Sequence, residues 1–226
     1  MNIERFEALS IRAARHAALS DVTRLQIVEM LTLSDRSSSE LGEMLSIPSN
    51  LLAHHLKQLV DAGLVTKRRS EGDRRRVYFT LNDIHGLATG PLTREHIVAG
   101  RVVFVCSANT ARSHLAAAAW RQHSSVPTIS GGTAPGERIN PAAIAAANRH
   151  GLAILDVSPR KLDVHAQAHD LIVTVCDRAH EELAGADWAH WSVPDPVTAD
   201  SDRAFDAATI ELVARVERLA EHVEAA

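Results

Sequence analysis

Apolar residues recur every three to four positions in three successive segments of the N-terminal third, which predicts three helices. The first begins at Asp21, a residue type that caps helices, the second covers 39–45, and the third covers 51–62 and ends at Gly63. The residues expected to face the core are Leu25, Val28, Leu31, Leu52, Leu56, Leu59 and Val60. Residues 47–50 form the predicted turn before the third helix, and 1–19 an added helix for dimerisation.

The pattern then changes to the alternation of strands over 64–67 and 77–81. Residues 67–76, which span the loop between them, carry six Lys and Arg against Glu71 and Asp73, a net charge of +4. Such a basic hairpin after a helix-turn-helix predicts a winged helix that contacts nucleic-acid phosphates. The expected fold of this part is α+β.

Roughly residues 10–85 resemble the ArsR family of winged-helix regulators. The resemblance rests on the start of the first helix (21–25), the stretch 54–59 within the third helix, and residues 63–65, which lead from that helix into the first strand. The hairpin at 73–75 also resembles the MarR group. This resemblance implies double-stranded DNA as a partner, the third helix in the major groove, and a homodimer that reads two half-sites. The predicted DNA contacts are Ser49, Asn50, His54, His55, Lys57, Gln58, Arg68, Arg69, Arg74, Arg75 and Arg76.

Further along, the β-branched and aromatic run 102–105 predicts a buried strand, and the Ala-rich run 114–122 predicts a helix. Between them lies the pattern Cys106-x5-Arg112-Ser113. Backbone N–H groups at a helix start bind anions and favour the thiolate form of a nearby cysteine. Arg112 can hold two oxygens of phosphate or arsenate, and Ser113 can donate to the sulfur. The predicted oxyanion-binding residues are Ser107, Ala108, Asn109, Thr110, Ala111, Arg112 and Ser113.

The segments that follow this loop resemble those of the low-molecular-weight tyrosine phosphatases and related arsenate reductases in their order along the chain. They are residues 129–133, the helix from Pro141 to near Gly151, residues 158–161 and Asp195-Pro196. The resemblance implies an α/β doubly wound parallel sheet. It also implies that Cys106 is the nucleophile, Arg112 the oxyanion clamp and Asp195 the proton donor.

The second of the chain's two cysteines, Cys176, ends the apolar run 171–176. Because parallel strands gather their carboxyl ends at one edge, we expect Cys176 on the same rim as Cys106. The resemblance to arsenate reductases implies that Cys176 is a second redox cysteine, which would form a disulfide with Cys106. An inert, buried cysteine is the alternative. A three-cysteine relay is excluded, because 177–183 contains no cysteine.

The substrate slot also bears on the choice between arsenate and phosphotyrosine. The resemblance to the tyrosine phosphatases implies tyrosines after the Asp-Pro pair, which wall a slot for an aromatic ring. Here Val197-Thr198-Ala199 follows Asp195-Pro196, and the chain's one tyrosine is the distant Tyr78, so these aromatic walls are lacking. We therefore expect an arsenate reductase with no tightly bound cofactor or metal, driven by thioredoxin, a glutaredoxin-type protein or a low-molecular-weight thiol. The alternatives are a phosphatase, or a regulator whose C-terminal domain senses an oxyanion or redox state.

The 226 residues suffice for two small domains, predicted at 1–92 and 101–226 with a linker over 93–100. Residues 1–95 carry 13 basic and 12 acidic residues and 96–226 carry 11 and 16, net charges of +1 and −5, which assigns DNA binding to the first part. Few cysteines and no long apolar run predict a cytoplasmic protein. A final helix is expected within 205–223, with Ile210, Val213, Val216, Leu219 and Ala220 inward.

Overall fold

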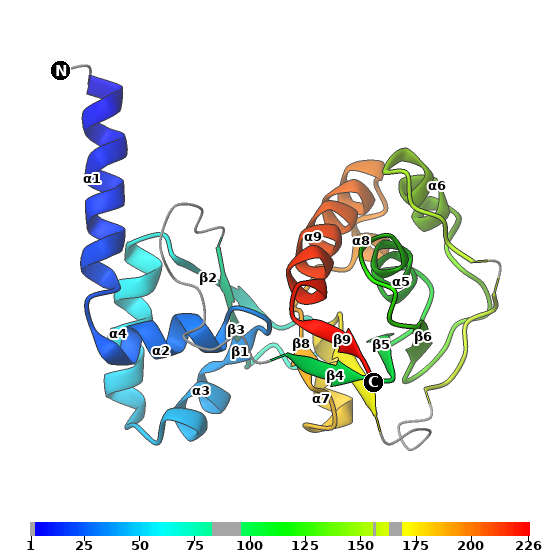
Figure 1. The fold of residues 1–226 in the computed structure, drawn as a ribbon, viewed down its shortest axis with the longest axis horizontal. Helices are drawn as coiled ribbons and strands as arrows, with labels where there is room; N and C mark the ends of the chain where they lie inside the picture. Colours follow the sequence, from blue (N-terminus) through cyan, green and yellow to red (C-terminus); the bar gives the residue numbers. More distant parts are fainter. Residues whose placement is uncertain (1–2, 83–95, 156, 163–168) are drawn as a thin grey trace. The chain divides into compact units, whose positions relative to one another are not determined.

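The structure, a computed structural model, describes residues 3–82, 96–155, 157–162 and 169–226 (Figure 1). The chain divides into two compact units. The first comprises 1–69 and 75–93, and the second comprises 70–74 and 94–226. Residues 93–95 of the predicted linker lie outside the described residues. Among the described residues, none of the helices combines the length and apolar content needed to cross a membrane.

The first unit is a winged helix-turn-helix, as predicted. A three-stranded antiparallel sheet, in the order β1-β3-β2, packs with the helices around one apolar core. The elements are α1 (Ile3–Ala18), α2 (Val22–Met30), β1 (Arg36–Ser37), α3 (Ser38–Leu45), α4 (Ser49–Asp61), β2 (Val65–Arg69) and β3 (Val77–Leu81). Asp21 caps α2 by accepting the Arg24 N–H at 2.9 Å, and Ser37 with Glu40 forms a capping box on α3.

The core differs from the predicted one in detail. Leu52, Leu56 and Leu59 are buried as expected, but Leu25 and Val60 are only half-buried. Ile27 takes the place predicted for Leu25 and is fully buried, because α2 turns a different side toward the sheet and α4. Helix α4 begins at Ser49, earlier than predicted, and Gly63 ends it in the left-handed conformation, with φ at 65°.

The second unit contains a parallel four-stranded sheet in the order β6-β5-β7-β8, which confirms the predicted α/β class. Helix α5 packs against α9, β5 and β6, and α7 packs against β5 and β7 (Figure 1). The elements are β4 (Ile97–Ala99), β5 (Arg101–Cys106), α5 (Arg112–His123), β6 (Thr128–Gly132), α6 (Pro141–Arg149), β7 (Asp170–Thr174), α7 (Asp177–Leu183), β8 (Ala189–His190), α8 (Pro196–Ala199), α9 (Asp202–Ala220) and β9 (Val223–Ala225).

Aromatic rings fill the centre of this unit. Phe104 on β5 lies between Trp120 and Trp191, with ring centroids 6.0 and 5.7 Å away. This packing fixes β5 and α5, the two elements that flank the loop after Cys106.

Two predictions about the edges of this unit were wrong. The expected linker contains β4, which pairs in parallel with β9, so these residues belong to the fold. In α9 the exposed fraction of Ile210 is 58%, and the face toward α5 is shifted around the helix axis. The buried residues of α9 are Phe205, Ala208, Thr209, Leu212, Val216 and Leu219.

Candidate oxyanion site

The loop between Cys106 and Arg112 is held from outside by its carbonyl groups. Those of Ser107, Ala108 and Thr110 accept backbone N–H groups from the segment 134–140 at 2.8–2.9 Å. In a trans peptide the C=O and the following N–H point in opposite directions. The N–H groups that follow these carbonyls therefore face the inside of the loop, and backbone donors beside the start of a helix are groups that can bind an anion.

Asn109 braces the same loop. It is fully buried and left-handed, with φ at 50°. Its amide nitrogen donates to Ser113 Oγ at 2.8 Å and to Ser130 Oγ at 3.1 Å, and its oxygen accepts the Arg160 N–H at 3.0 Å. Gly132 passes close beside it, since a Cβ there would lie 2.6 Å from the Ser107 carbonyl oxygen. The loop is thus fixed before any ligand arrives.

The predicted nucleophile and clamp meet at this loop. Cys106 Sγ lies 3.1 Å from Ser113 Oγ, and the cysteine is 3% exposed. The Arg112 guanidinium lies 2.9 Å from the Asp195 carboxylate through Nη2, and Nη1 donates to the Val193 carbonyl at 2.8 Å. The structure therefore brings Cys106, Arg112, Ser113 and Asp195 together, as the sequence predicts.

Cys176 also reaches the loop. Its sulfur accepts the N–H of Ser107 at 3.2 Å and that of Ala179 at 3.4 Å, at the start of α7. Burial raises the pKa of the Cys176 thiol, while Arg112, the Ser107 hydroxyl and the Ala179 N–H act against the rise. Burial works to lower the pKa of Arg112, but the negative forms of Cys176, Asp195, Cys106 and Glu71 raise it overall. Arg112 is thus the shared positive charge of the site.

The predicted DNA contacts fall into two groups. Most are exposed: Ser49, Asn50, His54, Lys57, Arg69, Arg74, Arg75 and Arg76. Arg68 and Gln58 are half-buried, and Gln58 accepts a hydrogen bond from Arg24. His55 was wrongly predicted to be exposed. It is 7% exposed and its Nδ1 lies 3.6 Å from Asp21 Oδ1, so it packs α4 against the start of α2.

The sequence pattern of the low molecular weight phosphotyrosine protein phosphatase family matches residues 101–226, more than half of the chain. The chain belongs to this family. In the solved structures, the second unit of this phosphatase-family chain is similar to the tyrosine phosphatase Wzb from Escherichia coli K30. That match has 22% identity and a TM-score of 0.50, and covers 55% of this chain and 98% of Wzb. It is also similar to an arsenate reductase from Archaeoglobus fulgidus, with 26% identity, a TM-score of 0.44, and coverage of 54% and 99%.

The pattern of the arsR family of bacterial regulatory proteins matches residues 21–67 of the same phosphatase-family chain. The arsenical resistance operon repressor of Staphylococcus xylosus is 38% identical over 52 residues, which is 23% of this chain and 50% of the repressor. The corresponding Staphylococcus aureus repressor is 39% identical over 51 residues, or 23% and 49%. The chain thus spans about half the length of these curated relatives, and joins an ArsR-type helix-turn-helix to a phosphatase-family domain.

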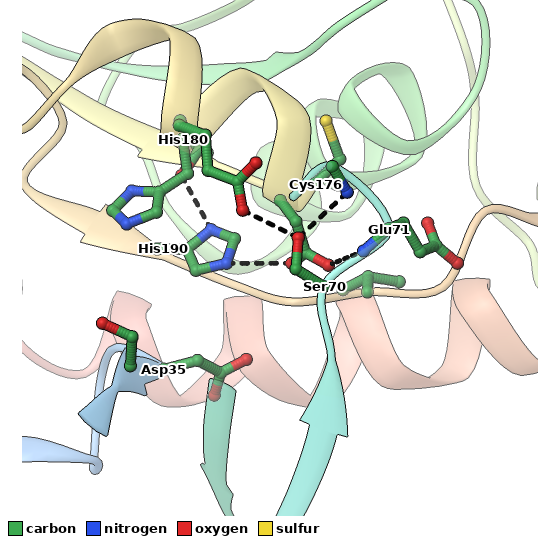
Figure 2. A network of polar contacts seen from close by, with 12 residues as sticks. Asp35, Ser70, Glu71, Cys176, His180 and His190 are labelled. Atoms are coloured by element: carbon green, nitrogen blue, oxygen red, sulfur yellow. Dashed lines mark hydrogen bonds and ion pairs between the residues drawn. The ribbon is translucent and has the colours of Figure 1, made fainter. Parts of the chain in front are cut away.

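The phosphatase-family domain also holds a buried polar network beside Cys176 that sequence reasoning missed (Figure 2). Asp177 Oδ1 lies 3.1 Å from His190 Nε2, and Thr174 Oγ lies 3.0 Å from His190 Nδ1. Asp177 Oδ2 accepts the Glu71 N–H at 2.8 Å. Burial works to raise the pKa of Asp177, but the hydrogen bonds from His190 and Glu71 lower it overall, so the group is a carboxylate at neutral pH.

One cluster within this network has residue types that bind metals. Ligand atoms of His180, Asp187 and His190 lie within 4.8 Å of one another. The two imidazole rings, however, stack 4.2 Å apart at an angle of 11°. The lone pairs of a ring nitrogen lie in the ring plane, so two nearly parallel rings do not aim at one ion. His180 Nδ1 instead lies 2.7 Å from Asp187 Oδ2, which makes the cluster a hydrogen-bonded support for α7.

Proposed function

We propose that this chain is a DNA-binding regulator whose phosphatase-family domain is a thiol-dependent arsenate reductase. The observation that carries this proposal is the contact of Cys176 with the oxyanion loop, through the N–H of Ser107 at 3.2 Å. A phosphatase needs a nucleophile, a clamp and an acid, but no second thiol at the loop. Reduction of arsenic needs two electrons, and two neighbouring thiols supply them as they become a disulfide.

The first step attaches arsenate to the protein. The Cys106 thiolate attacks the arsenic atom while Arg112 and the inward backbone N–H groups hold the oxygens. A sulfur–arsenic bond forms and an arsenic–oxygen bond breaks. Asp195 gives its proton to the departing oxygen, which leaves as water. For this role Asp195 has to be protonated when arsenate arrives, and its carboxylate has to move from Arg112 toward that oxygen.

The second step reduces the arsenic. The deprotonated sulfur of Cys176 attacks the Cys106 sulfur, a disulfide forms, and the electron pair of the sulfur–arsenic bond stays with arsenic. Arsenic falls from As(V) to As(III) and leaves as arsenite, while the two thiols lose two electrons in total. An external thiol, in the form of thioredoxin, a glutaredoxin-type protein or a small thiol, then restores both cysteines. A small thiol that takes the place of Cys176 gives the same overall balance.

The surroundings of Asp195 support arsenate over phosphotyrosine. The residues of α8 that follow it are aliphatic or small, and Val197 is 39% exposed. Tyr78, the one tyrosine of the chain, is fully buried in β3 of the first unit. An aromatic substrate ring therefore has no stacking partner in α8, whereas the small arsenate ion needs none.

Replacing Cys176 with Ser is expected to remove arsenate turnover driven by a protein dithiol, because no second thiol remains to complete the disulfide. Hydrolysis of an aryl phosphate, measured beside it, is expected to stay within about a factor of a few of wild type, since Cys106, Arg112 and Asp195 are kept. Arsenate-dependent thiol oxidation is the main readout. Brisk aryl phosphate hydrolysis by wild type without arsenate turnover would contradict the reductase and favour a phosphatase.

The first unit supports DNA binding through exposed polar residues at the start of α4 and basic residues on β2 and its loop. We propose that it acts as a homodimer, so that two copies of α4 read two half-sites. Helix α1 supports this, because Phe6, Leu9 and Ile11 are 56%, 42% and 56% exposed.

Replacing Arg69 with Ala is expected to weaken binding to duplex DNA about equally across sequences, because a basic residue on a wing contacts phosphate rather than base edges. The slope of log affinity against log salt should fall by about 1. Fluorescence anisotropy over a salt series measures both. Arg203→Ala, at an exposed arginine of α9, is the charge-matched control, and an equal loss in both variants would show that Arg69 makes no specific contribution.

A further inference from the structure

The second unit includes a short segment, Ser70–Arg74, that is fitted closely to α7. Ser70 Oγ donates to Glu181 Oε1 at 2.7 Å, and the Asp73 N–H donates to Glu181 Oε2 at 2.7 Å (Figure 2). The exposed fraction of Ser70 is 2%. Gly72 allows the close approach, since a Cβ there would lie 2.2 Å from Glu181 Oε2 and 3.2 Å from Arg178 Cα.

This fit carries the Glu71 carboxylate to the oxyanion clamp. Glu71 Oε2 accepts a hydrogen bond from Arg112 Nη1 at 3.3 Å. The same carboxylate accepts the N–H of Asp195, at 3.0 Å through Oε1 and 3.1 Å through Oε2. Its own N–H is held by Asp177. Glu71 thus contacts both the arginine that would bind the oxyanion and the residue that would protonate the leaving oxygen.

The charges at this point oppose an incoming oxyanion. Arg112 is faced by the carboxylates of Glu71 and Asp195, at 3.3 and 2.9 Å. A phosphate or arsenate dianion has to displace both carboxylates from the guanidinium, and once Asp195 is protonated for its proposed role, Glu71 is the negative charge that still opposes the dianion. Asp195 serves the proposed chemistry, whereas a phosphatase or reductase cycle has no step that needs the Glu71 carboxylate. The Glu71 side chain is 43% exposed, so its repulsion of the anion is moderated by solvent.

We propose that Glu71 is an internal competitor for Arg112, so that an oxyanion binds only as the segment Ser70–Arg74 gives up its contacts with Arg112 and Asp195. This inference rests on the proposed function, because it takes the Cys106 loop to be an oxyanion site. Glu71 is then a residue that sets the affinity of the site, and it keeps Arg112 neutralised when no oxyanion is bound.

Two variants test the proposal by different routes, with inorganic phosphate as the probe. Glu71→Gln removes the charge and keeps the size of the side chain. Gly72→Ala keeps the Glu71 charge but adds a Cβ 2.2 Å from Glu181 Oε2 and 3.2 Å from Arg178 Cα, so the Glu181 carboxylate has to move from the place where it holds Ser70 and Asp73. Glu182→Gln, at an exposed glutamate of α7, is the matched control. The dissociation constant for phosphate is measured by isothermal titration calorimetry on the full chain, with thermal melting as the check on folding.

Phosphate is expected to bind roughly three- to tenfold more tightly to Glu71→Gln and to Gly72→Ala than to wild type, and unchanged to Glu182→Gln. The sign of the change is decisive, because a merely damaged site would bind phosphate more weakly. If wild type binds phosphate and either test variant binds it no more tightly, the competition is wrong and the proposed function stands. If no folded protein of the series binds phosphate, the oxyanion site itself is wrong.

Discussion

The Cys106→Ser variant is expected to bind oxyanion and to lose turnover down to the uncatalysed rate. A serine hydroxyl is a far weaker nucleophile than a thiolate at neutral pH. Among the described residues, the side chain hydrogen-bonded to the Cys106 sulfur is that of Ser113, whose hydroxyl is too weak a base to activate a serine. Arg112 and the loop N–H groups are untouched, so binding is kept. Arsenate-dependent thiol oxidation and aryl phosphate hydrolysis measure the loss, and phosphate titration measures the retained binding.

This variant also separates catalysis from sensing. If phosphate or arsenate changes the affinity for DNA equally in wild type and in Cys106→Ser, the domain acts as a sensor that needs no covalent step. If turnover persists in Cys106→Ser, the nucleophile lies elsewhere and the assignment of Cys106 is contradicted. A change in DNA affinity that is lost together with turnover ties regulation to the chemistry.

The Arg112→Lys variant is expected to lower kcat by about 10²–10³-fold at unchanged net charge. The guanidinium uses Nη1 and Nη2 for separate partners, the Val193 carbonyl at 2.8 Å and Asp195 at 2.9 Å. The three N–H donors of an ammonium group share one nitrogen and cannot reproduce that planar fork. The loss should fall on kcat as well as KM, because charge on the oxygens increases in the transition state.

Arg203→Lys provides the control for Arg112→Lys, since Arg203 is an exposed arginine of α9. Steady-state kinetics with arsenate, and separately with an aryl phosphate, give kcat and KM for both variants. Full activity in Arg112→Lys would mean that positive charge alone is enough and that the fork has no catalytic role.

The sequence predicted those parts of the fold that depend on residues close together along the chain. The strand, Cys106 loop and helix follow one another directly along residues 101–123. Helices α2 and α3 have their own side-chain caps, and α4 has its own apolar face. His55 was misjudged because its burial depends on Asp21, which arrives from another helix. Ile210 was misjudged because the Ala-rich α9 offers more than one apolar face, and packing against α5 selects one of them.

The contact of Glu71 with Arg112 had no signal in the sequence. The two residues are 41 positions apart. Glu71 lies in the basic run 67–76, where the sequence indicates only that its negative charge lowers the net positive charge of that run. A glutamate in a polar loop is usually a solvated residue. Its position on the clamp follows from the fit of Gly72 against Glu181, which only the folded chain reveals.

The backbone character of the oxyanion loop has a consequence for how this site can change over generations. The carbonyl contacts that orient the peptides of Ser107, Ala108 and Thr110 are made by the backbone, so these contacts do not depend on which side chain stands at each position. The requirement for a particular residue type falls instead on Gly132, outside the loop, where any larger side chain would meet a loop carbonyl. The sequence record of the loop's shape therefore lies partly in β6, the strand that contains Gly132, and not only in the loop itself.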